Sequence, residues 1–241
     1  MTEPTARDRL IVALDVPTVA EAARLVATLG DSVTTYKVGL ELLFAGGLNF
    51  ATELKRLGKH VFLDVKLLDI GNTVEAAVAN ISEFGVTFLT IHGQDLKTMR
   101  AAVAGRGPKG PKILAVTVLT NLTTDDLKQQ GASLSPADLV VHRARLAHEA
   151  GCDGVIASGQ EAARIRDMVG PGFLIITPGI RLTGGTTDDQ ERVMTPDRAI
   201  AAGADYLVVG RPITRADDPK LAAETFVNHI RQTPMVRGRS N

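Results

Sequence analysis

Short, β-branched runs alternate along this chain with amphipathic segments of helical spacing, and this alternation constrains the fold more than any other feature. It is typical of a parallel sheet, because two parallel strands are joined by a long crossover that is usually a helix. The runs predicted to be strands are Leu10–Asp15, Thr34–Val38, His60–Lys66, Phe88–His92, Ile113–Leu119, Gly154–Ala157, Phe173–Thr177 and Tyr206–Val209. The segments predicted to be helices include Val19–Leu29, Asn49–Leu57, Thr73–Phe84, Pro136–Ala150, Glu161–Val169, Pro196–Ala202 and Pro219–Arg231.

Eight parallel strands, each followed by a helix, can close on themselves, and 241 residues are close to the size of one such barrel. An open doubly wound sheet is the alternative, but it typically begins with a glycine-rich phosphate turn after the first strand. Here that turn reads Leu14-Asp15-Val16-Pro17-Thr18. The sequence therefore predicts a single (β/α)8 TIM barrel of the α/β class, as one domain over residues 1–241 with flexible ends at about 1–8 and 233–241. The polar stretch 121–135 is expected to be a mobile loop or an extra helix.

Charge and cysteine content exclude several classes of protein. Lysine plus arginine and aspartate plus glutamate both total 27, so no overall positive field attracts nucleic acid or anionic lipid. The segment Met1–Arg9 lacks the apolar core of a signal peptide, and the apolar run Leu10–Leu14 is too short to cross a bilayer. We therefore expect a cytoplasmic protein without membrane or nucleic-acid partners. The single cysteine, Cys152, is predicted to be a buried, inert thiol.

The ends of the predicted strands carry polar residues, and in this fold functional residues collect at the C-terminal ends of the strands. The third strand is the most informative, because the period-two rule places Phe62, Asp64 and Lys66 on one face. The other face is entirely apolar and suits packing under the helices. The charged pair must therefore point into the mouth of the barrel, where an unpaired charge would be costly.

Lys37 on the second strand and Asp69 after the third can complete an alternating array with Asp64 and Lys66. Each lysine then has opposite charges nearby, which favours its ionised form and yields a positioned ammonium donor. The alternative is a satisfied ion-pair network that closes one end of the barrel without chemistry. Four charges converging on the catalytic face favour a functional site. His92, beside this cluster, is interpreted as a hydrogen-bonded packing residue rather than a catalytic acid.

From Leu10 to Phe226 the chain resembles the orotidine 5′-monophosphate decarboxylase family. Residues 64–73 match the family pattern Asp-x-Lys-x-x-Asp-Ile-x-x-Thr at every defining position. The supporting matches, in family order, are Ala13-Leu14-Asp15, Lys37-Val38-Gly39, Val118-Leu119-Thr120, Thr177-Pro178-Gly179-Ile180-Arg181, Gln190 with Arg192, and Val209-Gly210-Arg211-Pro212-Ile213.

This resemblance implies conversion of orotidine 5′-monophosphate (OMP) to UMP and carbon dioxide in pyrimidine biosynthesis, without a metal or cofactor. Lys66 would donate a proton to C6 of the pyrimidine, Asp64 would face the departing carboxylate, and Lys37 would bridge these charges and the ribose. Asp69 and Thr73 would reach into the neighbouring subunit's site, which implies a homodimer.

The resemblance also implies the substrate contacts, and a mobile loop near Gly184 and Gly185 would close over the substrate. The implied substrate-binding residues are Asp15 for the ribose, Thr120 for the pyrimidine, Gln190 for the base and phosphate, Arg181, Gly210 and Arg211 for the phosphate, and Ile70 and Pro178 beside them.

Two other functions fit the same barrel. Relatives resembling hexulose-phosphate synthase or keto-gulonate-phosphate decarboxylase share Asp-x-Lys-x-x-Asp but recruit magnesium through a glutamate after the second strand. This chain has Lys37 there, and a lysine repels a metal ion, so no metal site is predicted. A non-catalytic nucleotide-binding barrel would instead bind UMP and turn nothing over.

Overall fold

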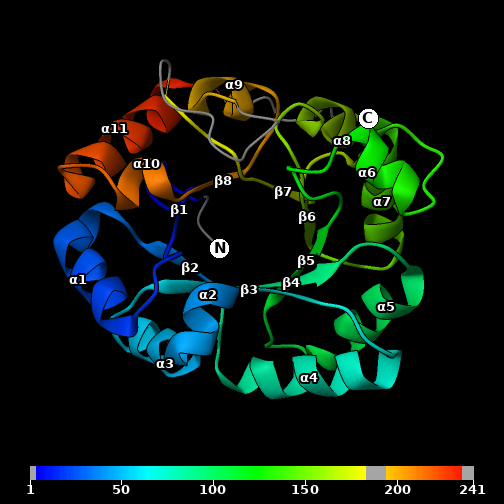
Figure 1. Cartoon of the computed structure of the whole chain (residues 1–241), viewed down its shortest axis with the longest axis horizontal. Helices are drawn as coiled ribbons and strands as arrows, with labels where there is room; N and C mark the ends of the chain where they lie inside the picture. Colours follow the sequence, from blue (N-terminus) through cyan, green and yellow to red (C-terminus); the bar gives the residue numbers. More distant parts are fainter. Residues whose placement is uncertain (1–3, 183–193, 235–241) are drawn as a thin grey trace.

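The computed structural model of the chain describes residues 4–182 and 194–234. Within these ranges eight parallel strands pair in sequence order, and the first also pairs with the last, so the sheet is closed. Figure 1 looks down the barrel, with the strands in the centre and the helices around them. The predicted (β/α)8 barrel is confirmed.

The strands agree with the predicted runs, except that the runs at 10–15 and 113–119 continue beyond the strand ends into loops. The strands are β1 (Leu10–Ala13), β2 (Thr35–Gly39), β3 (His60–Leu67), β4 (Phe88–His92), β5 (Lys112–Val116), β6 (Gly154–Ile156), β7 (Leu174–Thr177) and β8 (Tyr206–Val209).

Each predicted helix is present, and the stretch 121–135 contains the extra helix α6. The short helices α2 and α10 were not predicted. Nor was the longer helix α5, although the Asp95 side chain accepts a hydrogen bond from the Thr98 amide, as a helix N-cap does. In the described ranges the helices, with the 3-10 helix η1 and the π-helix η2, are α1 (Val19–Leu29), η1 (Gly30–Ser32), α2 (Leu40–Leu42), η2 (Leu43–Gly47), α3 (Leu48–Arg56), α4 (Gly71–Glu83), α5 (Leu96–Gly105), α6 (Thr124–Gln129), α7 (Pro136–Glu149), α8 (Ala162–Val169), α9 (Pro196–Ala201), α10 (Arg211–Thr214) and α11 (Pro219–Gln232).

The buried apolar side chains form two separate clusters. The larger lies between the strands and the helices, and the smaller fills the interior of the barrel. In the interior, the ring of Phe88 packs edge-on against Phe62, at a centroid distance of 6.1 Å, and against Tyr206, at 5.3 Å. These three rings form an aromatic floor under the C-terminal end of the barrel, which carries the polar residues.

The N-terminal end of the barrel is held by a buried ion pair. Arg166 of α8 is 5% exposed and donates to Asp205 Oδ2 at 2.6 Å and to the carbonyl oxygens of Gly170, Phe173 and Gly203. Burial raises the pKa of Asp205 above its usual value, although Arg166 opposes the shift. The N-terminal end of the barrel therefore contributes to stability, as it generally does in barrels of this type.

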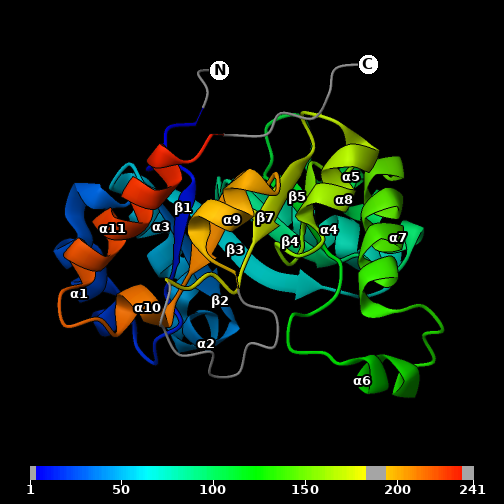
Figure 2. The same ribbon diagram turned by 90° about the horizontal axis from the view of Figure 1, so that it is seen from above.

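The short helices α2, α6 and α10 all lie at the opposite end of the barrel, with α6 apart from the other two (Figure 2). None of the helices in the described ranges is long and apolar enough to cross a membrane. Of the predicted flexible ends, residues 1–3 and 235–241 lie outside the described residues, while Thr5 and Asp8 hold a turn before β1. Cys152 is buried, and burial raises the pKa of its thiol to about 12.

Candidate active site

A cavity of about 550 Å³ opens at the C-terminal ends of the strands. It has the size of a small-molecule site and the location at which barrels of this type carry their chemistry. Most of the residues predicted to act on or bind a substrate line it: Asp15, Lys37, Asp64, Lys66, Thr120, Pro178, Arg181, Gly210 and Arg211.

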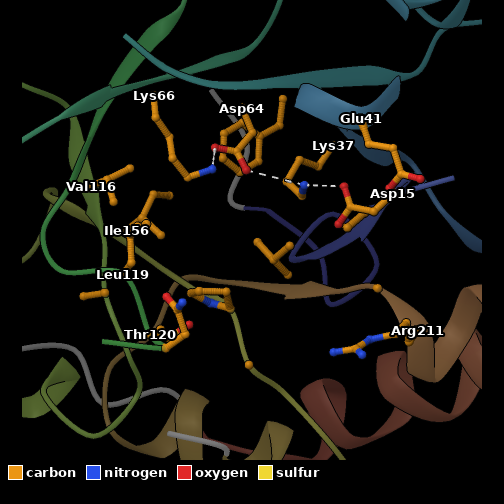
Figure 3. Close-up of a pocket in the computed structure, with 18 of the residues that line it drawn as sticks. Asp15, Lys37, Glu41, Asp64, Lys66, Val116, Leu119, Thr120, Ile156 and Arg211 are labelled. Atoms are coloured by element: carbon orange, nitrogen blue, oxygen red, sulfur yellow. Dashed lines mark hydrogen bonds and ion pairs between the residues drawn. The ribbon is translucent and has the colours of Figure 1, made fainter. Parts of the chain in front are cut away.

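Four charged side chains of alternating sign form a row along one wall of this cavity (Figure 3). Lys66 Nζ lies 2.8 Å from Asp64 Oδ1, and Lys37 Nζ lies 3.4 Å from Asp64 Oδ2. On its other side, Lys37 Nζ lies 2.8 Å from Asp15 Oδ1. The row therefore runs Asp15, Lys37, Asp64, Lys66, and it ends on an ammonium group that is the most exposed of the last three.

The electrostatics of the row keep its buried members charged. Burial alone would raise the pKa of Asp64, but Lys37 and Lys66, with hydrogen bonds from Lys66 and Thr90, hold it below the usual value. Burial alone would lower the pKa of Lys37, but Asp64 and Asp15 hold it above the usual value. At neutral pH the row therefore carries both signs of charge in a place with little water.

A register shift between β3 and β4 presents two members of the row to the cavity. Leu63 pairs with Leu89, but the next recorded pair is Leu67 with Ile91, so three residues of β3 lie opposite one of β4. Within this bulge Lys66 has a φ of 49°, and it is the only non-glycine residue with a positive φ in the described part of the chain.

The opposite wall of the cavity carries neutral polar and cationic groups. In Figure 3, Thr120 and Arg211 lie across the cavity from the row of charges, while Val116, Leu119 and Ile156 form an apolar side. Arg181 lines the cavity as well, so guanidinium groups come from the loop after β7 and from α10. This arrangement can hold an anion at one side and an apolar ring between the walls.

Three predicted residues do not line the cavity of this single chain. Asp69, Ile70 and Thr73 are exposed, and Asp69 Oδ1 accepts a hydrogen bond from the Ile70 amide at 2.6 Å. The predicted array of two lysines and two carboxylates therefore differs in one member, since Asp15 rather than Asp69 completes it. Gln190, Arg192 and the loop near Gly184 and Gly185 lie outside the described residues.

His92 ends β4 next to the row. Burial lowers the pKa of its imidazole, and Lys66 and Arg143 lower it further. The ring is half-buried and makes no hydrogen bond within residues 4–182 and 194–234, so the hydrogen bond expected for this packing residue is not found there.

Several residues of the site were missed. Thr90 donates to Asp64 Oδ1 at 2.9 Å, and the period-two rule could have found it, because Phe88, Thr90 and His92 share one face of β4. Arg215 lines the cavity four residues after Arg211, a spacing that returns to the same face of a helix. Glu41 also lines it, beside Asp15 in Figure 3, and only its place after the second strand hinted at that.

The chain is similar to known proteins over nearly its whole length. Orotidine 5′-phosphate decarboxylase of Afipia carboxidovorans is 57% identical over 229 residues, covering 95% of this chain and 97% of that protein. The enzyme of the same name from Methylorubrum extorquens is 57% identical over 221 residues, covering 92% and 94%. The crystal structure of orotidine 5′-phosphate decarboxylase from Lactobacillus acidophilus superposes with a TM-score of 0.82 at 35% identity, covering 92% and 99%.

A further solved structure, an uncharacterized conserved protein from Geobacillus kaustophilus, superposes with a TM-score of 0.79 at 35% identity, covering 92% of this chain and all of that one. The predicted resemblance to a family of decarboxylases is confirmed by these matches. A family model also matches residues 8–226, nearly the whole chain, and on this evidence the protein belongs to the orotidine 5′-phosphate decarboxylase / HUMPS family.

Proposed function

We propose that the protein converts OMP to UMP and carbon dioxide, without a metal or cofactor, and that Lys66 donates the proton to C6. The observation that carries this proposal is the row of alternating charges along one wall of the cavity, which ends on the Lys66 ammonium, with cationic groups on the opposite wall. A nucleotide with a carboxylate at one end and a phosphate at the other matches that distribution of charge.

The reaction breaks the bond between C6 and the carboxylate, and the electron pair stays on C6 while carbon dioxide leaves. That carbon is vinylic and has no conjugated sink, so the protein must stabilise the developing negative charge. Lys66 Nζ is fixed by Asp64 Oδ1 at 2.8 Å, and the Lys66 side chain is 28% exposed, so it can reach a bound base. Its proton then moves to C6 and leaves a neutral amine, which regains a proton from solvent.

Asp64 has a second role in this proposal. Its carboxylate stays charged beside the position of the substrate carboxylate, so repulsion raises the energy of the bound substrate and disappears when neutral carbon dioxide forms. Lys37 prevents this carboxylate from being neutralised by a proton and links it to Asp15, which would accept hydrogen bonds from ribose hydroxyls.

The remaining contacts follow from the opposite wall. Thr120 would contact the pyrimidine, with Pro178 beside it, while Arg181, Arg211 and the Gly210 amide would bind the phosphate. Binding energy from this remote dianion supports positioning of the base against Lys66. We extend the proposal to Gln190, which would link the base and the phosphate.

We also propose a homodimer in which Asp69 and Thr73 act in the partner's site. Both are exposed in the single chain, and their neighbour Ile70 is 78% exposed although apolar, which suits a surface that a second copy covers. The chain would act as one domain over residues 1–241 in the cytoplasm, with no nucleic acid as partner.

Mixing two inactive variants tests the shared site. Lys66→Ala and Asp69→Ala chains that exchange freely form half of their dimers as heterodimers, and one of the two sites in each has both residues intact. About a quarter of the sites should recover activity. Exchange without recovered activity contradicts the shared site.

An absorbance assay with OMP, with and without EDTA, tests the reaction itself. We expect turnover that EDTA leaves unchanged, and we expect Lys66→Ala to lower kcat by several orders of magnitude. Lys128→Ala is a matched control, because Lys128 pairs with Asp125 on the surface of α6.

Each alternative has its own result in this assay. Activity that EDTA abolishes and magnesium restores identifies a metal-dependent relative on the same barrel. UMP binding without turnover identifies a non-catalytic barrel. Near-native turnover of Lys66→Ala contradicts the role of this lysine.

A further inference from the structure

We propose that Thr90 is a positioning residue, whose hydroxyl holds Asp64 and Lys66 in register so that the Lys66 ammonium stays aimed at the reacting carbon. This inference rests on the proposed function for its catalytic consequence. The positioning itself follows from the hydrogen bonds between Thr90 of β4 and the residues of β3.

The bulge in β3 creates the need for such a residue. Asp64, Val65 and Lys66 together lie opposite Thr90, because the paired positions on either side are Leu63 with Leu89 and Leu67 with Ile91. A bulge leaves backbone groups without their ladder partners, and a buried N–H without a partner is costly. Thr90 Oγ1 accepts the hydrogen bond of the Lys66 amide at 3.0 Å and so supplies the missing partner.

The conformation of Lys66 makes that bond important. A non-glycine residue with a φ of 49° is disfavoured, and it persists only where its surroundings hold it. The hydrogen bond to Thr90 acts directly on the strained residue. Loss of this bond would let the backbone of β3 relax and would move the root of the Lys66 side chain.

The same hydroxyl also fixes the carboxylate. Thr90 Oγ1 donates to Asp64 Oδ1 at 2.9 Å, and that oxygen is the one that accepts from Lys66 Nζ at 2.8 Å. A hydroxyl has a single proton, so donation to Asp64 leaves its lone pairs free for the Lys66 amide. One side chain thus holds both ends of the ion pair, the backbone of the cation and the carboxylate of the anion.

Water cannot easily replace this hydroxyl. Thr90 is 0% exposed, and its strand neighbours on the same face are the aromatic floor residue Phe88 and the half-buried His92. Valine has nearly the same shape but would leave the Lys66 amide and a lone pair of Asp64 unpaired. Serine keeps the hydroxyl and loses only a methyl group.

The catalytic consequence is a split between kcat and KM. Displacement of the Lys66 ammonium would affect only the chemical step, because the phosphate contacts around Arg211 lie on the opposite wall of the cavity. We expect Thr90→Val to lower kcat by about a hundredfold and to change KM little, because a shift of about 1 Å in a reacting group has an effect of that size. Thr90→Ser should stay within a few-fold of the unchanged protein.

A spectroscopic measurement reports on the same contact without turnover. The pKa of Asp64, measured by NMR on protein with 13C-labelled aspartate, should rise in Thr90→Val and stay near its original value in Thr90→Ser. Thr98→Val is the matched control, because Thr98 is also a buried threonine that donates to an aspartate, Asp95, but at the start of α5. It should change neither kcat nor the Asp64 titration.

The outcomes separate this inference from the proposed function. Unchanged kcat and Asp64 titration in Thr90→Val, or equal losses in Thr90→Val and Thr90→Ser, would overturn it. Thr90→Ala, which also lacks the hydroxyl, serves if the valine variant does not fold. If the unchanged protein fails to turn over OMP, the proposed function falls, and the Asp64 titration still decides whether Thr90 holds the carboxylate.

Discussion

Replacement of Asp64 by asparagine should destabilise the folded protein by about 3 kcal/mol at pH 7. Asp64 is 9% exposed and lies between the ammonium groups of Lys66, at 2.8 Å, and Lys37, at 3.4 Å. Asparagine keeps the shape and can still accept from Thr90, but it leaves two cations facing each other across a neutral group. Removal of one partner from a buried ion pair costs about 3–5 kcal/mol, and we expect the lower end because Lys37 keeps Asp15.

Urea unfolding followed by circular dichroism measures this change, at one fixed protein concentration because assembly would shift the midpoint. The pKa of Asp64 is lower in the folded protein than in the unfolded chain, so its contribution is present above the unfolded pKa and is lost as the pH falls through the folded pKa. The difference between the two proteins should therefore be constant between about pH 5 and 8 and shrink in acid.

Glu149→Gln is the matched control. Glu149 also faces two cations, Arg100 at 3.3 Å and Arg145 at 3.6 Å, but these side chains are about half exposed. Exposed pairs of this kind contribute about 0–1 kcal/mol, so the midpoint should barely move. Equal stabilities of Asp64→Asn and the unchanged protein at pH 7 would refute the reasoning about the buried row.

Three further outcomes are expected. Gly39→Ala should lower kcat/KM for OMP by about tenfold or more, because a Cβ there would lie 2.8 Å from Lys37 Nζ and disturb the row; a kcat/KM within twofold of the original contradicts this. Arg166→Met should lower the free energy of unfolding in urea by about 3–5 kcal/mol, since Asp205 would stay buried without its cation, while kcat of the folded enzyme stays unchanged. His92 should titrate below pH 6.5 by NMR, so that its protonation in mild acid opposes folding, and a midpoint above the usual value would contradict the burial argument.

The barrel and one wall of its site could be predicted because both depend on local periodicity. The alternation in β3 places Asp64 and Lys66 on the interior face and Leu63 on the helix side, and the structure has them so. The rule that strand ends carry function then located Lys37 at this cavity without knowledge of the pairing, while Arg211 was placed there by the family resemblance.

The parts that could not be predicted depend on contacts between strands. The partner of Lys37 is Asp15 because β1 and β2 pair with Ala13 opposite Lys37, so the end of β1 meets the end of β2. Asp69 was expected there, but α4 starts at Gly71, and Asp69 lies exposed just before it. The role of Thr90 depends on the register shift between β3 and β4, which no pattern within one strand encodes.

The aromatic floor of Phe62, Phe88 and Tyr206 has a consequence for how sequences of this kind can diverge. It lies between the charged row at one end of the barrel and the ion pair of Arg166 at the other, so substitutions at the two ends share no contacts. Their effects should therefore add, since distant sites without common partners are nearly additive. Substitutions that raise stability at one end and substitutions that change the substrate at the other can therefore accumulate independently during evolution.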